Sequence, residues 1–221
     1  MPDWYCWISW SFVIIVACYI LFELHYFWRM ALSLLLARFI KRKCHVLETT
    51  IISGICLTTD LDHFLCHMNN ARYLREMDFA RVDFYERSKL YHTILKNGGS
   101  IVQGSTTIRY RKFIRPFRRF YITSKIIYWD NQSVFMEHRF IRPKDQFIHC
   151  IAICRQRIIG CSVDEILMEL LTQSKADDLQ DTISVENGEA VESKLKPEPS
   201  EELKKWIEYN EISSRNLRRN S

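Results

Sequence analysis

Glycine-based motifs that mark two large enzyme classes are missing from this chain. Glycine accounts for only 6 of the 221 residues. The sequence contains neither the Gly-x-Ser-x-Gly elbow of serine hydrolases nor a glycine-rich loop that cradles phosphate. Serine-hydrolase chemistry and nucleotide-triphosphate chemistry are therefore disfavoured.

A strong excess of one charge is also missing. The formal net charge is only +5, and the charges are unevenly spread along the chain. No nucleic-acid-binding motif accompanies them, so we predict no nucleic-acid partner. By contrast, 48% apolar and 13% aromatic residues predict one folded domain with appendages rather than a disordered chain.

Metal and disulfide patterns are not evident either. His63 and His67 lie four residues apart, but no third ligand and no His-Glu-x-x-His pattern accompanies them, so we expect no metal. The eight cysteines are scattered over the chain instead of forming a dense framework. We therefore interpret them as reduced thiols and small apolar residues.

The amino-terminal segment predicts a membrane anchor. Residues 4–22 carry no formal charge, and a helix of 19 residues at ~1.5 Å rise per residue approaches the ~30 Å hydrocarbon core. The basic residues begin at Arg29, so the positive-inside rule places the longer carboxyl-terminal part in the cytosol. Aromatic residues that suit the two membrane interfaces flank the segment: Trp4, Trp7, Trp10, Tyr26 and Trp28. We predict a single-pass anchor over residues 1–28.

A cleaved signal peptide is the alternative, and it would make the protein secreted. This alternative is less favoured because a basic start and a small-residue cleavage site are not evident. Residues 29–43 alternate basic and apolar positions, which predicts a basic amphipathic juxtamembrane helix at a lipid surface or a cytosolic continuation of the anchor. The sequon that begins at Asn131 would be glycosylated only on the lumenal side.

Residues 44–174 predict one α+β domain. The pattern predicts a strand over 45–59, and apolar residues at Tyr73, Met77, Ala80 and Phe84 predict a helix over about 70–89. The remaining predicted elements are strands over 101–113, 119–129, 133–142 and 146–158 and a short helix over 162–171. Residues 175–200 predict an acidic disordered linker, and residues 201–221 regain a helical pattern.

Hydrogen-bonding residues gather before the start of the long helix. Residues 67–74 read His-Met-Asn-Asn-Ala-Arg-Tyr-Leu, and Asp60 and Asp62 precede them. An Asn at a helix N-cap accepts a bond from one free backbone N–H, while the other free N–H groups and the helix dipole attract an incoming oxygen. This arrangement suits the carbonyl oxygen of a thioester.

The string resembles the hotdog-fold acyl-CoA thioesterases of the 4-hydroxybenzoyl-CoA thioesterase type, and within them the membrane-associated member-six branch. The resemblance covers about residues 45–160, and residues 206–211 resemble the carboxyl-terminal signature of the same branch. It implies a hotdog fold, in which an antiparallel sheet wraps around a central long helix, and a homodimer joined through sheet edges. It also implies lipid metabolism at the endoplasmic reticulum.

Two functions follow as expectations from the resemblance. The first is hydrolysis or binding of fatty acyl-CoA thioesters, with coenzyme A as part of the substrate and no separate cofactor. The second is a non-catalytic acyl-lipid-binding or scaffold protein that keeps the fold. In the family the acid usually lies four residues before the motif His, whereas Asp62 lies five residues before His67.

The predicted catalytic residues are Asp62, Asp60 and His67, and the predicted substrate-binding residues at the helix start are Asn69, Asn70 and Tyr73. Asp62 is the expected base, and His67 and Asn70 are expected to position the thioester. Each has a structural alternative: the two Asp cap turns, His67 bonds a backbone carbonyl, and the two Asn cap the helix.

A basic cluster lies further along the chain, at Arg109, Arg111, Lys112, Arg115, Arg118 and Arg119. Arginine matches the geometry of phosphate, so we expect Arg109 and Arg111 to bind the substrate at the nucleotide end of coenzyme A. The cluster could equally face an anionic membrane or form a solvated strand face.

Overall fold

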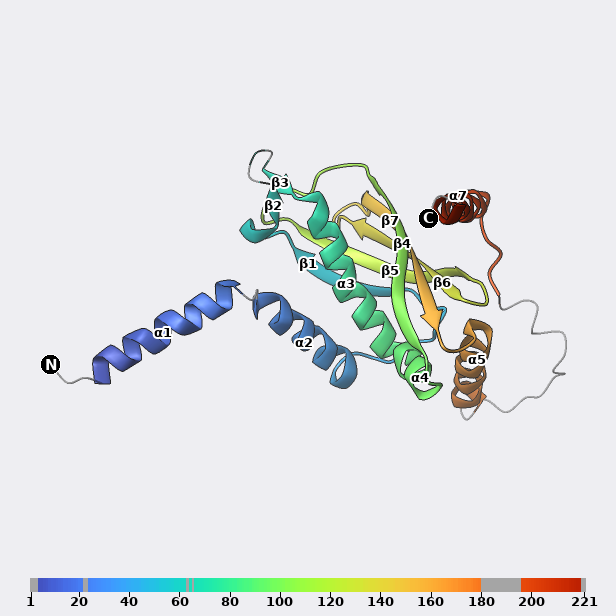
Figure 1. Ribbon diagram of the computed structural model, residues 1–221, viewed down its shortest axis with the longest axis horizontal. Helices are drawn as coiled ribbons and strands as arrows, with labels where there is room; N and C mark the ends of the chain where they lie inside the picture. Colours follow the sequence, from blue (N-terminus) through green and yellow to red (C-terminus); the bar gives the residue numbers. More distant parts are fainter. Residues whose placement is uncertain (1–3, 22–23, 63, 65, 180–195, 220–221) are drawn as a thin grey trace.

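In the computed structural model, a five-stranded sheet packs against one long helix (Figure 1). The structure describes residues 4–21, 24–62, 64, 66–179 and 196–219. The strand order is β1-β5-β6-β7-β4, and every neighbouring pair is antiparallel. The strands are β1 (Thr50–Ile55), β4 (Ser100–Tyr110), β5 (Arg119–Trp129), β6 (Ser133–Ile141) and β7 (Ile148–Ile159). The predicted α+β hotdog arrangement is confirmed.

The long helix is α3 (Asn70–Arg87), and its apolar stripe faces the sheet. Tyr73, Met77, Ala80 and Phe84 are each at most 2% exposed. They pack with inward side chains of the strands, among them Ile122 of β5, Phe140 of β6 and Ala152 of β7. Burying one such large apolar side chain stabilises the fold by about 1.5–3 kcal/mol, so this stripe fixes how α3 lies on the sheet.

Several predicted boundaries differ from the observed ones. Of the strand predicted over 45–59, only β1 is observed as a strand. A single 3₁₀ turn, η1 (Thr58–Asp60), follows β1 and takes the end of the predicted range. The long helix stops at Arg87, since Lys89 takes a left-handed backbone conformation with φ 60°. The chain then forms α4 (Leu90–Lys96), which the sequence analysis missed.

Two helices follow the sheet. Helix α5 (Val163–Leu179) is longer than the predicted 162–171 and enters the segment expected to be a disordered linker. Most of that predicted linker, residues 180–195, lies outside the described residues. Helix α7 (Glu201–Arg219) lies on the face of the sheet opposite α3, where the Trp206 ring contacts the Phe135 ring with centroids 6.2 Å apart.

The amino-terminal segment forms two helices, α1 (Trp4–Leu21) and α2 (Leu24–Phe39). Helix α2 therefore begins five residues before the predicted juxtamembrane segment. Within the described residues, neither helix alone has the length and apolarity needed to cross a bilayer. The segments Trp7–Tyr19 and Leu24–Phe39 satisfy that test only as a pair, with a bend of 71° between them.

Helix α2 packs alongside α3 (Figure 1). Its cations reach carboxylates on α3: Arg29 pairs with Glu76, and Lys41 pairs with Asp83. Glu76 is 3% exposed and Asp83 is fully buried. Burial of paired carboxylates against α2 makes this helix part of the folded domain.

Candidate active site

A short hairpin precedes α3 and brings the predicted acid and histidine together. Strand β2 (Leu61–Asp62) pairs antiparallel with β3 (His67–Met68), and Asp62 lies directly opposite His67. Side chains at directly opposed positions have Cβ atoms about 4.5–5.5 Å apart. With a spacing of five residues, Asp62 and His67 therefore occupy opposed positions on the same side of the hairpin.

One ring nitrogen of His67 can accept a proton. The ring is stacked on Phe113 with centroids 4.0 Å apart, and the residue is 7% exposed. Its Nδ1 lies 2.8 Å from the carbonyl oxygen of Met68, which can only accept, so Nδ1 carries the hydrogen in the neutral ring. The other nitrogen, Nε2, is buried and has no hydrogen-bond partner among the described residues. Neutral His67 thus offers an unshared lone pair at Nε2, so in this form it can accept a proton but cannot donate one to a thioester.

The two aspartates differ in their surroundings. The Asp60 carboxylate accepts a hydrogen bond from the Leu57 N–H at 2.9 Å, and it lies 3.9 Å from the Arg72 guanidinium. The Asp60 carbonyl accepts a bond from the Asn69 N–H, which ties the hairpin to the start of α3. Asp60 is therefore held in a structural position. Asp62 is only half-buried, and its carboxylate accepts a bond from the Phe64 N–H at 3.0 Å.

The start of α3 leaves one backbone donor open. Asn69 is the N-cap, since its side-chain oxygen accepts from the Ala71 N–H at 2.9 Å and its carbonyl accepts from the Arg72 N–H. The capping role considered for Asn69 is thus observed. The carbonyl of Asn70 accepts from the Tyr110 hydroxyl at 3.1 Å. In the described part of the chain, the Asn70 N–H has no acceptor, so it can receive an oxygen that carries developing negative charge.

Tyr73 is a buried residue in the first turn of α3, next to this site. The residue is 2% exposed, and its ring meets those of Tyr110 and Phe140 edge-on at 5.1 and 4.9 Å. Burial raises the pKa of Tyr73 above its usual range, so the phenol stays protonated. Tyr110 and Phe113 were missed as site residues, although both fall in the aromatic-rich segment predicted as a strand.

The residues of the predicted basic cluster lie in different places. Arg109 lines a hollow of about 220 Å³ beneath α7, together with Glu202 and Trp206. Arg111 extends over the Phe147 ring at 5.1 Å from its centroid. The structure therefore does not bring Arg109 to the hairpin. The rest of the cluster, Lys112, Arg115, Arg118 and Arg119, lines a separate cavity beside Phe113.

Metal and thiol chemistry find little support among the residues that the structure describes. No group of three His, Cys, Asp or Glu side chains in those ranges could hold a metal ion. Cys56 and Cys150 are buried free thiols. Burial raises the pKa of Cys56 to about 11 and that of Cys150 to about 12, so neither is a reactive thiolate at neutral pH.

Comparisons with known proteins identify the family of this chain. The sequence profile of the thioesterase-like superfamily matches residues 56–207, well over half of the chain. The chain belongs to the thioesterase-like superfamily. The Protein THEM6 of Drosophila melanogaster is 36% identical over 211 residues, covering 96% of this chain and 98% of the relative. The Protein THEM6 of Xenopus laevis is 38% identical over 208 residues, covering 94% and 91%.

A solved structure supports the fold of this thioesterase-like chain. The probable thioesterase YbaW of Escherichia coli is similar with a TM-score of 0.52 and 22% identity, covering 56% of this chain and 96% of that protein. The thioesterase-like region at residues 56–207 contains the hairpin, α3 and Trp206 of α7, whose ring contacts Phe135 of the sheet. The predicted family is thus confirmed.

Proposed function

We propose that the protein is a membrane-anchored acyl-CoA thioesterase, and that the hairpin at the start of α3 holds the thioester. The observation that carries this proposal is the placement of Asp62 opposite His67. The buried Nε2 of His67 has no hydrogen-bond partner in the part of the chain that the structure describes. Residues 62–70 thus supply two acceptors, the Asp62 carboxylate and Nε2 of His67, and one backbone donor, the Asn70 N–H.

The proposed reaction uses these groups as follows. A water molecule donates one hydrogen bond to Nε2 of His67 and the other to the Asp62 carboxylate, and its oxygen attacks the thioester carbonyl carbon. Asp62 takes the proton as the general base, while the Asn70 N–H holds the oxyanion. When the C–S bond breaks, the proton passes to the sulfur of coenzyme A. A general base contributes about 10²–10⁴-fold to the rate.

Hydrolysis of a panel of fatty acyl-CoA thioesters by the purified full-length chain in lipid nanodiscs tests this proposal. We expect Asp62→Asn to lower kcat/KM by about 10²-fold or more. Asp60→Asn is the matched control, since it keeps an acceptor oxygen for the Leu57 N–H and lies outside the proposed chemistry. Equal rates for the Asp62 variant and the wild type would exclude the base.

The second candidate is an acyl-lipid-binding protein that does not turn over its ligand. The bond from the Phe64 N–H to the Asp62 carboxylate favours it, because a turn-capping carboxylate has a structural reason to be present. Saturable binding of a fatty acyl-CoA without release of free thiol would support this candidate over the enzyme.

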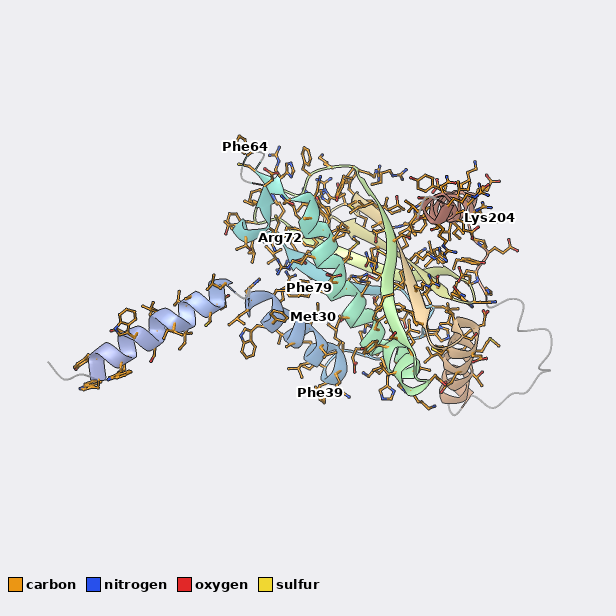
Figure 2. The ribbon with its side chains drawn as sticks, viewed as in Figure 1. Met30, Phe39, Phe64, Arg72, Phe79 and Lys204 are labelled. Atoms are coloured by element: carbon orange, nitrogen blue, oxygen red, sulfur yellow. The ribbon has the colours of Figure 1, made fainter. Side chains whose placement is uncertain are left out.

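The membrane part of the proposal comes from α1 and α2. Helix α1 contains no formally charged residue, and its apolar side chains are widely exposed. Helix α2 has exposed apolar residues at Trp28, Leu32, Leu35 and Phe39 (51–75% exposed) on the side away from α3, and Figure 2 shows Phe39 there. We propose that α1 anchors the chain in the endoplasmic reticulum while α2 lies at the lipid surface, with the domain in the cytosol.

The sequon at Asn131 tests this topology. Asn131 is exposed in the turn between β5 and β6, so a glycosyltransferase on the lumenal side would reach it. We expect the mobility of the cellular protein to be unchanged by endoglycosidase. A shift to lower mass would indicate a lumenal or secreted domain.

A homodimer is also proposed. Strands β1 and β4 are the two edges of the sheet, so among the described residues each has no neighbouring strand on one side. Pairing through an edge would join two sheets into one. The mass of the protein in nanodiscs or detergent, measured by light scattering, distinguishes one copy from two.

A further inference from the structure

Exposed apolar side chains surround the candidate active site. Phe64, in the turn of the β2–β3 hairpin, is 96% exposed, and Phe117 and Phe113 of the loop after β4 are 67% and 61% exposed. Leu57, which follows β1, is 43% exposed. We call these four residues the apolar rim. A group of exposed apolar side chains bordered by polar residues is typical of a surface that contacts a lipid or another protein.

Backbone hydrogen bonds join the chain segments that carry the apolar rim. The Met68 N–H of β3 donates to the Ile114 carbonyl at 2.9 Å, which connects the hairpin to the loop after β4. The Phe117 N–H donates to the Cys56 carbonyl at 2.8 Å, which connects the same loop to the segment after β1. The rim residues therefore lie on three neighbouring segments and form one surface.

The apolar rim borders the proposed thioester site on the side of the domain nearer α1. The Phe113 ring is stacked on the His67 ring with centroids 4.0 Å apart. Figure 2 shows Phe64 on the hairpin at the end of the domain nearer α1, whereas Lys204 of α7 lies at the opposite end. The rim thus lies on the side from which the proposed membrane anchor leaves the domain.

The charges beside the apolar rim favour a lipid surface over a protein partner. Arg115 lies between Phe113 and Phe117 in the sequence, and Arg118 follows Phe117. Both arginines are exposed, and neither forms an ion pair within the residues that the structure describes. Aromatic rings suit the boundary of a bilayer, and cations near that boundary are attracted to anionic lipids. A loop that alternates the two kinds of side chain therefore matches a membrane surface.

We propose that the apolar rim inserts into the surface of the bilayer, so that the site takes up a long-chain acyl-CoA directly from the lipid. This uptake rests on the proposed hydrolysis and the proposed anchor. Transfer of each exposed ring from water to lipid is favourable in proportion to its apolar area. The acyl chain of the substrate is subject to the same effect, so a site bordered by lipid receives the chain without exposing it to water.

Photo-cross-linking in nanodiscs tests the insertion and does not depend on hydrolysis. In the full-length chain, p-benzoylphenylalanine replaces Phe64, which is 96% exposed. The matched control carries the same group in place of Tyr209 of α7, which is 67% exposed. We expect mass spectrometry to find lipid adducts at position 64 and none at position 209. Adducts to protein instead of lipid at position 64, or equal lipid adducts at both positions, would overturn the proposal.

Steady-state kinetics in nanodiscs test the uptake of substrate from lipid. The variant Phe64→Ser/Phe117→Ser removes two rings of the rim and keeps Phe113, which contacts His67. We expect KM for a long-chain acyl-CoA embedded in the nanodisc lipid to rise by about tenfold or more, with kcat changed less than about twofold. KM for a water-soluble short-chain acyl-CoA should change less than about twofold, because this substrate does not come from the lipid.

The kinetic control is Tyr209→Ser/Leu217→Ser, which removes two side chains of α7 that are 67% and 69% exposed and should leave both KM values unchanged. A KM of the rim variant that rises equally for both substrates, or for neither, would refute uptake from lipid while leaving hydrolysis intact. If the wild type cleaves no thioester, the proposed function fails, and the cross-linking experiment alone decides whether the rim inserts.

Discussion

The ion pair between Arg29 of α2 and Glu76 of α3 allows a direct test of whether α2 belongs to the folded domain. The guanidinium meets both carboxylate oxygens, and one of the two contacts is 2.6 Å long. The same guanidinium lies 4.2 Å from the centroid of the Phe79 ring. Glu76 is 3% exposed, and its burial raises its pKa, an effect that Arg29 partly counters.

Replacing Arg29 by Met would leave a buried carboxylate without its main partner. Breaking a buried pair in this way costs about 3–5 kcal/mol. The Arg29 side chain is 30% exposed, so water can reach part of the site and we expect the lower end, about 3 kcal/mol. A change of 1 kcal/mol shifts Tm by about 2–4 °C in a chain of this size, so the expected fall in Tm is about 6–12 °C.

Thermal unfolding of the nanodisc-bound protein, followed by circular dichroism, measures this loss. The double variant Arg29→Met/Glu76→Leu replaces the pair with apolar side chains and should recover most of the lost stability. A single-variant loss below about 0.5 kcal/mol would show that α2 is not held by this pair. If the double variant is instead less stable than the single variant, the lost stability does not come from the unpaired carboxylate.

Three further predictions concern stability. Burial lowers the pKa of His138 to about 3, so between pH 6.5, its usual pKa, and pH 5 only the unfolded chain takes up this proton. The free energy of unfolding should therefore fall by about 2 kcal/mol over that interval. In urea titrations, His138→Gln should reduce this dependence of the unfolding free energy on pH. Trp206→Ala should free α7 from Phe135, seen as faster proteolysis at residues 196–219, without changing kcat because α7 covers the opposite face of the sheet from α3. Asn69→Ala should cost about 1 kcal/mol in urea unfolding and Asn69→Asp much less, since Asp also accepts from the Ala71 N–H.

Elements with a strong period were predictable from the sequence. Strand β5 matches its predicted bounds, because β-branched and aromatic residues fill Arg119–Trp129 up to the turn at Asp130. The stripe of α3 was predicted for the same reason. The hairpin β2–β3 was not, since strands of two residues carry no period.

The site was predicted only in part. Asp62 and His67 were singled out by their motif, but their pairing across a hairpin depends on the turn between them. Arg109 lies apart from the cations of the following loop, and its side of the sheet follows from the alternation of successive strand residues between the two faces. Ile108 packs with the core on the α3 side, so Arg109 faces α7. The Arg29–Glu76 pair joins residues 47 positions apart, and no local pattern indicates such a contact.

The central claim is that Asp62 and His67 act on one water molecule at the start of α3. A double-mutant cycle on kcat/KM for a fatty acyl-CoA measures it most directly, with Asp62→Asn, His67→Gln and the double variant in the full-length chain. Groups that act as a unit lose their effect together, so we expect the double variant to be about as slow as the slower single variant. Losses that simply add, or a cycle in which neither substitution slows hydrolysis, would contradict the claim.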